Sequence, residues 1–293
     1  MVRAQQRSSA LFAPLIATPA SLDERALAAT VDLLAGGSVV VLSGAGMSTD
    51  SGIPDYRGPG APVRTPMTIS EFRSGPVAQQ RYWARSHLGW QRMGTARPNE
   101  GHRSLAALET AGYVSELITQ NVDGLHQQAG SRQVIDLHGR IDEVICLDCS
   151  RITPRLELHR RLTDLNPDFG AHLDLVSAPD GDVEFDDTLD FRIAACLRCE
   201  GALKPHVVFF GDSVAKPLVK HCFNAVDAAR AMVVAGSSLT VMSGLRFVRH
   251  ARRSGRPIVI VNRGATRGDE LADWKIEAGC SSTLGRLAAE LGA

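Results

Sequence analysis

The sequence predicts an α/β protein built on a doubly wound parallel sheet, with a smaller second part formed by two insertions. Short, wholly apolar segments recur along the chain, as in parallel strands that are covered on both faces. The residues between most of these segments suffice for a crossover helix. Glycine or small polar residues follow each segment, where such a sheet gathers its ligands. The expected strands are 39–42, 117–119, 207–210, 232–235 and 258–261.

The composition is that of a globular protein without a strong net charge. The chain has 293 residues, of which 44% are hydrophobic and 22% charged, so it can bury a sizeable core. Its 32 Lys and Arg balance its 32 Asp and Glu, so we expect no nucleic-acid partner. Nearly all of the basic residues are Arg, a skew that we attribute to genome composition rather than to a binding patch. No stretch approaches the roughly 20 apolar residues that cross a bilayer, so we expect no membrane partner.

The first helix is expected to begin just after residue 21. Ser21 and Glu24 form a capping-box pattern, and apolar residues follow at helical spacing. We interpret residues 1–21 as a flexible tail, which implies a cytoplasmic protein. These first residues also contain arginine and serine but no acid, so a transit peptide to the mitochondrial matrix is the alternative.

Two segments interrupt the alternation of strands and helices. Residues 58–100 contain several prolines around a helix expected at 77–87, and we interpret them as a helical insertion. Residues 141–203 contain paired cysteines and an acidic stretch that begins at Asp180, and they form the second insertion. The sheet domain is assigned the remaining ranges, 22–57, 101–140 and 204–293.

Four of the six cysteines form two Cys-x2-Cys pairs, which is the spacing of thiolate metal ligands. Four thiolates complete a tetrahedral zinc shell and leave no position for water, so we expect one structural Zn²⁺ per chain. Buried cysteines without a metal are the alternative. A zinc ribbon could also grip nucleic acid, but the neighbouring acidic stretch would repel phosphate. The expected ligands are Cys146, Cys149, Cys196 and Cys199.

A glycine-rich turn at 44–49 follows the first expected strand. It resembles a dinucleotide-binding turn only in part, because Thr49 stands where the third glycine of G-x-G-x-x-G would be. The apolar strand before it directs the turn at a crevice where backbone N–H groups can meet a pyrophosphate. His138 is one of nine histidines, and a structural role is its first interpretation. A near-neutral pKa would suit it to general-base work.

Several longer motifs together resemble those of the sirtuin family. They lie in the family's order, and the resemblance is colinear from about residue 22 to the C-terminus. The segments that carry it, besides the cysteine pairs, are 44–57, 120–123, 137–139, 208–212 and 236–239. Three further segments resemble class II sirtuins, the branch that contains a mitochondrial lipoamidase and ADP-ribosyltransferase. These segments are 82–85, 146–149 and 178–182.

The resemblance implies a Rossmann-like NAD-binding domain and a zinc-bearing, NAD-consuming protein-lysine deacylase. Its products would be nicotinamide, free lysine and O-acyl-ADP-ribose. His138 corresponds to the catalytic base, which frees a ribose hydroxyl, and Asn121 acts in catalysis beside the nicotinamide. Cys280 corresponds to a cofactor-pocket residue rather than a nucleophile. The residues implied in NAD binding are Gly44, Ala45, Gly46, Ser48, Asp55, Tyr56, Arg57, Gln120, Asn121, Asp123, Gly236, Ser237, Ser238, Asn262 and Cys280.

The resemblance also implies a protein or peptide substrate that carries an acylated lysine. The substrate would lie extended between the two domains and pair through its backbone with one segment of the enzyme. The family usually has Glu after this segment and Phe before Arg57, where this chain has Asp212 and Tyr56. The pairing residues are Val208, Phe209, Phe210 and Gly211.

Tyr82 and Arg85 lie three residues apart, so on one helix face both could point into one pocket. A Tyr-x-x-Arg pair resembles the one with which class III sirtuins bind acidic acyl chains. We therefore expect a preference for longer or carboxylated acyl groups over acetyl. The alternative is that Tyr82 packs in the core and Arg85 is solvated.

Two other functions fit the same motifs. The fold could serve mainly as a protein ADP-ribosyltransferase, although such a transfer has less need of His138 as a base. A non-catalytic NAD sensor or adaptor is the second, but Asn121, Asp123 and His138 together favour catalysis. We expect the protein to be a monomer.

Overall fold

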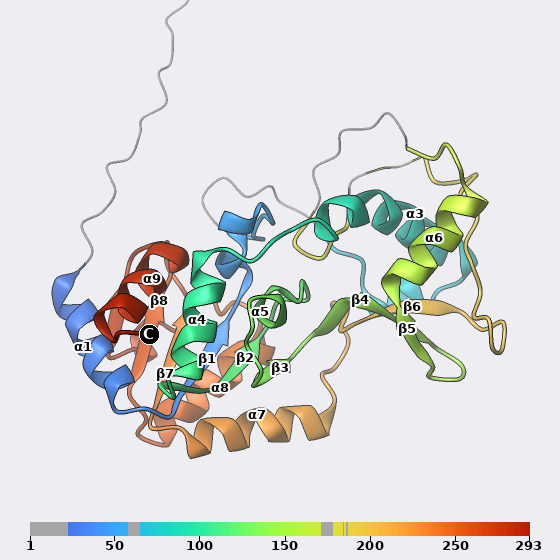
Figure 1. Ribbon diagram of the computed structural model, residues 1–293. Coiled ribbons are helices and arrows are strands. Elements are labelled where there is room, and N and C mark those ends of the chain that lie inside the picture. The colour runs from blue at the N-terminus through green and yellow to red at the C-terminus, as the bar shows by residue number, and fades with distance from the viewer. Residues whose placement is uncertain (1–22, 58–64, 171–177, 184, 186) are drawn as a thin grey trace, which may run out of the picture.

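The computed structural model describes residues 23–57, 65–170, 178–183, 185 and 187–293, which form two sheets (Figure 1). The larger sheet is parallel, with the strand order β3-β2-β1-β7-β8-β9. Its order reverses between β1 and β7, where a doubly wound sheet opens a crevice for ligands. The predicted fold class is confirmed. The strands are β1 (Val39–Ser43), β2 (Val114–Thr119), β3 (Val134–Asp136), β7 (Ala231–Ala235), β8 (Ile258–Val261) and β9 (Trp274–Ile276).

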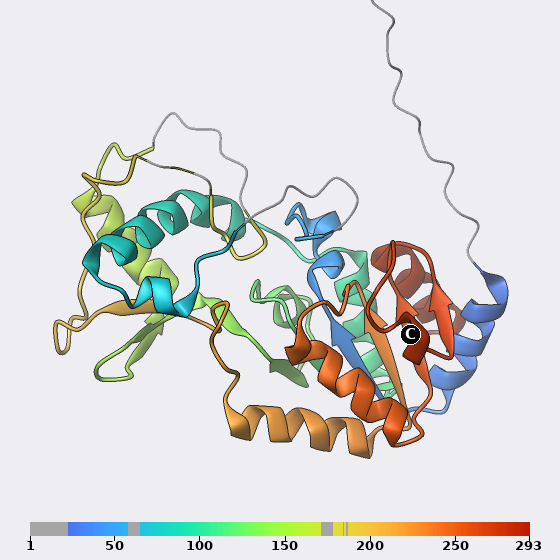
Figure 2. The same ribbon diagram turned by 180° about the vertical axis from the view of Figure 1, so that it is seen from behind.

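Helices cover both faces of this sheet, which is why its central strands are apolar along their whole length. Alternate residues of β1 pack into different cores: Val39 and Val41 into one, Val40 and Leu42 into the other. Helices α7 and α8 cover the second of these cores and lie side by side (Figure 2). The covering helices are α1 (Glu24–Ala35), α4 (Glu100–Thr110) and α9 (Cys280–Glu290) on the first core, and α7 (Lys216–Ala228) and α8 (Met242–Arg253) on the second.

Short helical segments follow the strands of the large sheet at its ligand edge or connect them. They hold the loops there in compact turns instead of extended chain. These segments are η1 (Ala45–Met47), η2 (Thr49–Ser51), α5 (Leu125–Gln128) and η3 (Asp269–Leu271).

The smaller domain combines helices with an antiparallel sheet of order β5-β4-β6. Its core is aromatic, with Phe72, Trp83 and Phe191 almost fully buried. Arg155 is also buried, and its guanidinium lies 5.1 and 5.0 Å from the ring centres of Trp83 and Trp90. The elements are α2 (Ile69–Phe72), α3 (Pro76–Met93), β4 (Gly139–Cys146), β5 (Ile152–Pro154), α6 (Arg155–Leu165) and β6 (Leu203–Val207).

One predicted strand of the large sheet, 207–210, was wrong. Strand β6 ends at Val207 and pairs with β4 in the small antiparallel sheet. Val207 and Phe209 are buried against the small domain's aromatic core, so their apolar character does not reflect a central parallel strand. Beyond Val207 the chain is in no strand: Val208 N–H bonds to the carbonyl of His138 at 2.8 Å, Phe210 forms an isolated bridge with Thr68, and the chain then runs to α7.

Helix α1 begins at Glu24 with Asp23 as its N-cap, two residues later than the capping-box pattern predicts. The carboxylate of Asp23 accepts hydrogen bonds from the N–H groups of Arg25 (3.0 Å) and Ala26 (3.2 Å). This satisfies two of the unpaired donors at the helix start. Ser21 and the tail expected at residues 1–21 lie outside the described residues.

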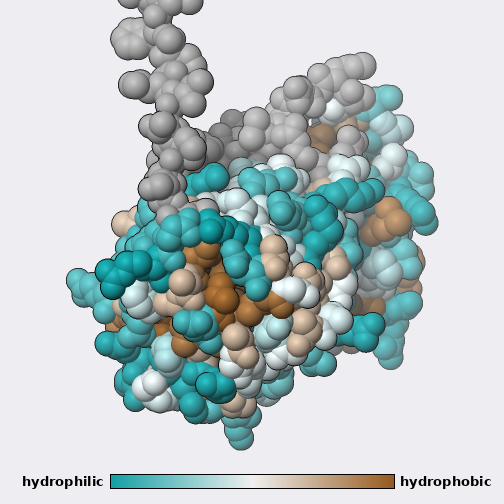
Figure 3. Space-filling view, turned by 60° about the vertical axis from the view of Figure 1, so that its left-hand side comes forward, coloured by the Kyte–Doolittle hydropathy of each residue, from teal (hydrophilic) through white to brown (hydrophobic). Residues whose placement is uncertain are grey.

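Figure 3 views the molecule from the side of the sheet domain, where hydrophilic residues surround apolar residues gathered in the middle of the face. Apolar atoms contribute more than half of the surface of an ordinary folded protein, so apolar residues on this face need no separate function. None of the helices in the described ranges is both long and apolar enough to cross a membrane.

The two Cys-x2-Cys pairs fold into matching turns that face each other. In each turn the N–H four residues after the first cysteine bonds to that cysteine's carbonyl: Ser150 to Cys146 at 3.0 Å and Glu200 to Cys196 at 2.9 Å. Ser150 and Glu200 adopt φ values of 56° and 60°, which close both turns. Each turn thereby directs two thiols at the same point.

The four thiols are spaced as zinc ligands are. The sulfur atoms of Cys146 and Cys199 are 3.5 Å apart, those of Cys149 and Cys196 are 3.8 Å apart, and all four lie within 4.8 Å of one another. Four thiolates about 2.3 Å from a tetrahedral zinc ion would be about 3.8 Å apart. The cluster therefore fits a structural zinc that joins the β4 turn to the chain before β6.

Replacing one of these ligands should release zinc and loosen the smaller domain. We expect Cys146→Ser to lower the zinc content well below one per chain, because a structural zinc site needs all four ligands. The loss should also lower the melting temperature, and metal analysis and calorimetry measure the two effects. Cys222→Ser is the matched control, since Cys222 is equally buried but lies in α7. Full zinc content in Cys146→Ser would contradict this assignment.

Candidate active site

A cavity of about 870 Å³ lies at the carboxyl ends of β1, β2, β7 and β8, between the large sheet and the smaller domain. This is the size of a typical cofactor site, and it lies at the reversal of strand order. Most of the residues expected at the site line it. They are Gly44, Ala45, Gly46, Asp55, Tyr56, Arg57, Tyr82, Gln120, Asn121, His138, Val208, Phe209, Phe210, Gly211, Gly236, Ser237, Ser238 and Asn262.

The glycine turn after β1 lies against the turn after β7, backbone to backbone. Gly46 N–H donates to the carbonyl of Gly236 at 2.8 Å. A Cβ on Gly44 would lie 2.7 Å from Cβ of Ser237, and Gly236 has a φ of 66° that favours glycine. Only residues without side chains allow this approach, which keeps the backbone of the turn open to the cavity. The N–H groups of Gly44 and Gly46 are bonded to the carbonyls of Ala235 and Gly236, so the cradle fits a dinucleotide with a phosphate against the N–H of Ala45.

A buried polar network ties this turn to the one after β2. Asn121 Nδ2 donates to the carbonyl of Gly44 (3.0 Å) and to Ser48 Oγ (3.1 Å), and Ser48 Oγ donates to Asp123 Oδ2 (2.6 Å). Asp123 also accepts a bond from Leu125 N–H at 2.9 Å. Ser48 and Asp123 do not line the cavity but lie behind Asn121, so they hold its amide in place.

Burial raises the pKa of Asp123, and its bonds from Ser48 and Leu125 oppose that rise.

A second link joins the β2 turn to the β7 turn, where Gln120 Nε2 donates to Ser237 Oγ at 2.7 Å. Hydrogen bonds therefore connect all three turns that meet at the cavity.

His138 is held in one tautomer by its two neighbours. Its Nδ1 lies 2.8 Å from the carbonyl of Gln120, which can only accept, so Nδ1 carries the proton. Its Nε2 therefore has the free lone pair, to which Ser243 Oγ donates at 2.8 Å. Burial lowers the pKa of His138; the Gln120 carbonyl opposes the shift, and Arg246 adds to it. The ring is thus neutral at pH 7 and presents Nε2 as a base beside the cavity.

The sequence analysis did not identify Ser243 or Arg246, although both line the cavity. They lie in the first two turns of α8, and no motif or spacing marks them. Their proximity to His138 follows only from how α8 packs beneath the turn after β7. Met242, from the same turn, lines the cavity as well, as do the residues of the segment 208–211.

Tyr82 and Arg85 do not share one pocket. Tyr82 lines the cavity and packs edge-on against Phe72, with ring centres 5.4 Å apart. Arg85 does not line it: its guanidinium pairs with Asp182 at 2.7 Å and also donates to the carbonyl of Val183. The expectation that both point into one pocket is therefore wrong for Arg85, because a carboxylate from the second insertion holds its charge.

That end of the cavity is acidic instead. Asp180 and Asp182 both line it, together with Tyr56 and Tyr82. Burial raises the pKa of Asp182 to about 6, although the charge of Arg85 lowers it. Burial and the bonded Asp180 raise the pKa of Tyr56, so the Tyr56 hydroxyl stays protonated at neutral pH.

Cys280 lies in the core and does not line the cavity. It begins α9, is 5% exposed, and its thiol lies 3.8 Å from the carbonyl of Val261. Burial raises the pKa of its thiol to about 12, so it is a poor nucleophile. It supports the end of β8 directly before Asn262.

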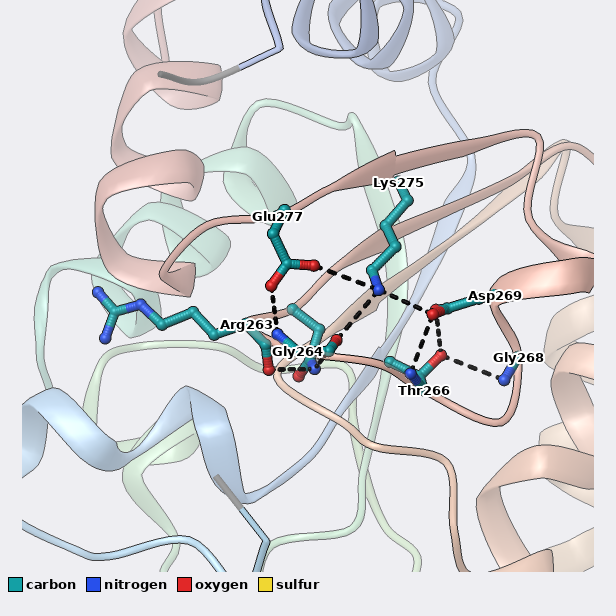
Figure 4. A network of polar contacts seen from close by, with 8 residues as sticks. Arg263, Gly264, Thr266, Gly268, Asp269, Lys275 and Glu277 are labelled. Carbon is teal, nitrogen blue, oxygen red and sulfur yellow. Dashed lines mark hydrogen bonds and ion pairs between the residues drawn. The ribbon is translucent and has the colours of Figure 1, made fainter. Parts of the chain in front are cut away.

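A charged network holds the loop after Asn262 in place (Figure 4). Lys275 Nζ bonds to the carbonyl of Gly264 (3.1 Å) and to Asp269 Oδ2 (2.8 Å), and Glu277 accepts from Gly264 N–H. Asn262 Nδ2 also donates to the carbonyl of Gly264 at 3.1 Å. The loop therefore forms a fixed wall of the cavity, from which the side chain of Arg263 extends away from the network.

Adding one methyl group at Gly236 should damage the cradle. In Gly236→Ala the new Cβ would crowd Gly46 C at 2.6 Å, and overpacking of this kind costs about 1–3 kcal/mol, so KM for NAD⁺ should rise about tenfold or more. Gly255→Ala is the matched control, because Gly255 has nearly the same φ, 67°, and no atom within 4 Å of its Cβ. Both variants strain the backbone, but only Gly236→Ala also crowds a neighbour, so a comparison of their KM values for NAD⁺ separates the two effects. Equal effects in the two variants would contradict the role of close packing.

The comparisons with known proteins agree with this geometry. A model of the Sir2 family matches residues 44–243. NAD-dependent protein deacetylase 1 of Mycobacterium avium (strain 104) is 54% identical over 265 residues, which cover 89% of this chain and 94% of that protein. NAD-dependent protein deacetylase 1 of Streptomyces coelicolor is 52% identical over 270 residues, with 91% and 90% covered.

Solved structures show the same fold. The Sir2–p53 peptide–NAD⁺ structure superposes with a TM-score of 0.72 at 32% identity, and covers 90% of this chain and 98% of that one. A structure of Sir2 bound to acetylated peptide gives 0.72 at 30% identity, with 91% and 98% covered. The chain therefore belongs to the Sir2 family, the sirtuins, whose members are NAD-dependent protein deacetylases with NAD as co-substrate.

Proposed function

We propose that this sirtuin is a class II protein-lysine deacylase that yields nicotinamide, free lysine and O-acyl-ADP-ribose. NAD supplies the ADP-ribosyl group that accepts the acyl chain. The observation that carries the proposal is the fixed tautomer of His138, whose basic Nε2 lies beside the cavity. Acyl transfer to a ribose hydroxyl needs a base to remove the hydroxyl proton, whereas simple ADP-ribosyl transfer has less need of one.

Each part of the cavity supports one role. The backbone N–H of Ala45 suits a phosphate, and Asn262 with the loop that it helps to hold suits the adenosine half. Asn121, held by Ser48, suits the nicotinamide end. We assign His138 as the residue that removes a proton from the ribose.

The peptide would lie between the segment 208–211 and the start of α8. Val208 N–H and the carbonyl of Phe210 are already bonded, to His138 and Ile69 respectively, so a peptide would pair along the other edge of the segment. Phe210 and Met242 are large apolar residues, and they are 37% and 43% exposed. They flank the place where the lysine stem would enter.

We further propose that the enzyme accepts longer uncharged acyl groups. The cavity is roomy, and its wall at Tyr82 and Phe209 is aromatic, with ring centres 5.1 Å apart. The expected preference for carboxylated chains has no support, because Arg85 is paired with Asp182 and a further carboxylate, that of Asp180, lines that end. Like charges brought together cost several kcal/mol. The class II branch, the cytoplasmic location and the monomeric state stay predictions.

His138→Ala should nearly abolish turnover while the fold survives. Loss of a general base typically costs about 10²–10⁴-fold in rate. The test measures nicotinamide release from NAD⁺ and an acetyl-lysine peptide, with O-acyl-ADP-ribose identified by mass spectrometry. His221→Ala is the control, since His221 is exposed and pairs with Glu116 outside the cavity. If the wild-type enzyme left labelled ADP-ribose mainly on protein, the result would instead support an ADP-ribosyltransferase. If the wild-type enzyme showed no turnover at all, it would support a sensor.

A four-carbon pair of acyl groups tests the acidic end of the cavity. We expect kcat/KM for butyryl-lysine to exceed that for succinyl-lysine by at least about tenfold, since only succinyl-lysine carries a carboxylate toward Asp180. Asp180→Asn should lower the ratio of kcat/KM for butyryl-lysine to kcat/KM for succinyl-lysine. Asp164→Asn should leave this ratio unchanged, because Asp164 lies on α6 and outside the cavity. A higher value for succinyl-lysine would overturn the proposed selectivity.

A further inference from the structure

The outer surface of α7 and α8 carries a concentration of positive charge. Together these two helices contain six Lys or Arg and one acid, Asp227, although the whole chain is balanced. We define the basic face as five of these cations and leave out Arg252, which is also exposed but pairs with Asp273. They are Lys216, Lys220, Arg246, Arg249 and Arg253.

Helical spacing brings these residues onto one side. Arg246, Arg249 and Arg253 follow one another at three and four residues, opposite the buried side of α8 that holds Phe247 and Val248. Lys216 and Lys220 are likewise four residues apart on α7. The helices are held side by side, since the rings of Phe223 and Phe247 lie 5.0 Å apart.

The charge of the basic face is not neutralised locally. Neighbouring acids contact other groups: Asp273 forms an ion pair with Arg252 at 2.9 Å, and the carboxylates of Asp227 and Glu116 lie 2.6 and 2.9 Å from ring nitrogens of His250 and His221. Asp212, at the rim, accepts a bond from Ser213 N–H. Among the described residues, none of the five cations forms an ion pair within 4 Å. A partner with negative charge would therefore find available cations.

The basic face is continuous with the cavity. Lys216 and Arg246 line the cavity itself, beside Met242. Arg249 and Arg253 lie about 4.5 and 10.5 Å farther along the axis of α8. That distance equals one to three residues of an extended chain. A substrate whose acyl-lysine is in the cavity would thus bring its flanking residues over the face.

We infer that the basic face binds acidic residues that flank the acyl-lysine of a protein substrate. The inference rests on the proposed deacylase function, because it needs a peptide in the cleft. Charge complementarity of this kind raises the association rate and selects partners, and it weakens as salt is added. The face would thereby direct the enzyme to acidic proteins, whereas the cleft, which binds backbone, reads little sequence.

The test uses two acetyl-lysine peptides that differ only in Glu or Gln at positions within about five residues of the lysine. We expect wild-type kcat/KM to be about three- to tenfold higher for the Glu peptide at low ionic strength, because two or more exposed ion pairs form. High salt should remove the difference. Arg249→Glu combined with Arg253→Glu should abolish or reverse it and leave the Gln peptide unchanged, since neither arginine lines the cavity.

The matched control is Arg25→Glu combined with Arg160→Glu, which changes the net charge equally on exposed sites of α1 and α6. Its preference should equal that of the wild type. Turnover of both peptides at the same kcat/KM would overturn the inference while the deacylase function stands. No nicotinamide release from either peptide would refute the proposed function, and the inference with it. If the wild type showed no preference between the peptides but bound duplex DNA, and the variant with Arg249→Glu and Arg253→Glu did not bind it, the face would be assigned to nucleic acid instead.

Discussion

The close approach of two glycine turns is the constraint on which the cavity depends. The turns after β1 and β7 touch through backbone atoms alone, with Gly46 N–H bonded to the carbonyl of Gly236 at 2.8 Å. Neighbouring parallel strands bring their following turns together, but ordinary side chains would force those turns apart. Gly44 and Gly236 remove that obstacle, so backbone rather than side chain forms this wall. A phosphate can then be bound by groups that have no rotamers to order.

The turn after β2 completes the site because hydrogen bonds fix it to both glycine turns. Asn121 reaches the carbonyl of Gly44, and Gln120 reaches Ser237. The backbone of Gln120 also sets the tautomer of His138, so the same residue that joins the turns orients the base. Fixed, buried partners of this kind hold a catalytic group without reorganisation during the reaction. The geometry of the sheet edge therefore also determines the orientation of the base.

Local patterns predicted most of the sheet and the zinc ligands, because their physical causes are local, whereas most of the cavity residues were expected only from the resemblance to the sirtuins. Parallel strands that are buried on both faces are apolar, and zinc ligands on one tight turn are commonly separated by two residues, so 39–42 and the pair of Cys146 and Cys149 were recognisable. The segment 207–210 was misassigned because an apolar run does not reveal which domain buries it. Arg85 was misplaced for a similar reason, as its partner Asp182 lies almost a hundred residues away. Ser243 carries no signal at all, because its role exists only through packing of α8.

Charge in this molecule is segregated in a way that the balanced total conceals. Carboxylates of Asp180 and Asp182 line the end of the cavity near Tyr82, whereas Lys216 and Arg246 line the rim beside α7 and α8. An exposed rim charge is screened by water and salt, so it acts on approach and orientation more than on affinity. A carboxylate within the cavity is desolvated, as the raised pKa of Asp182 indicates, and so it acts at short range on the group that enters. Selection of the protein and selection of the acyl group can therefore change independently.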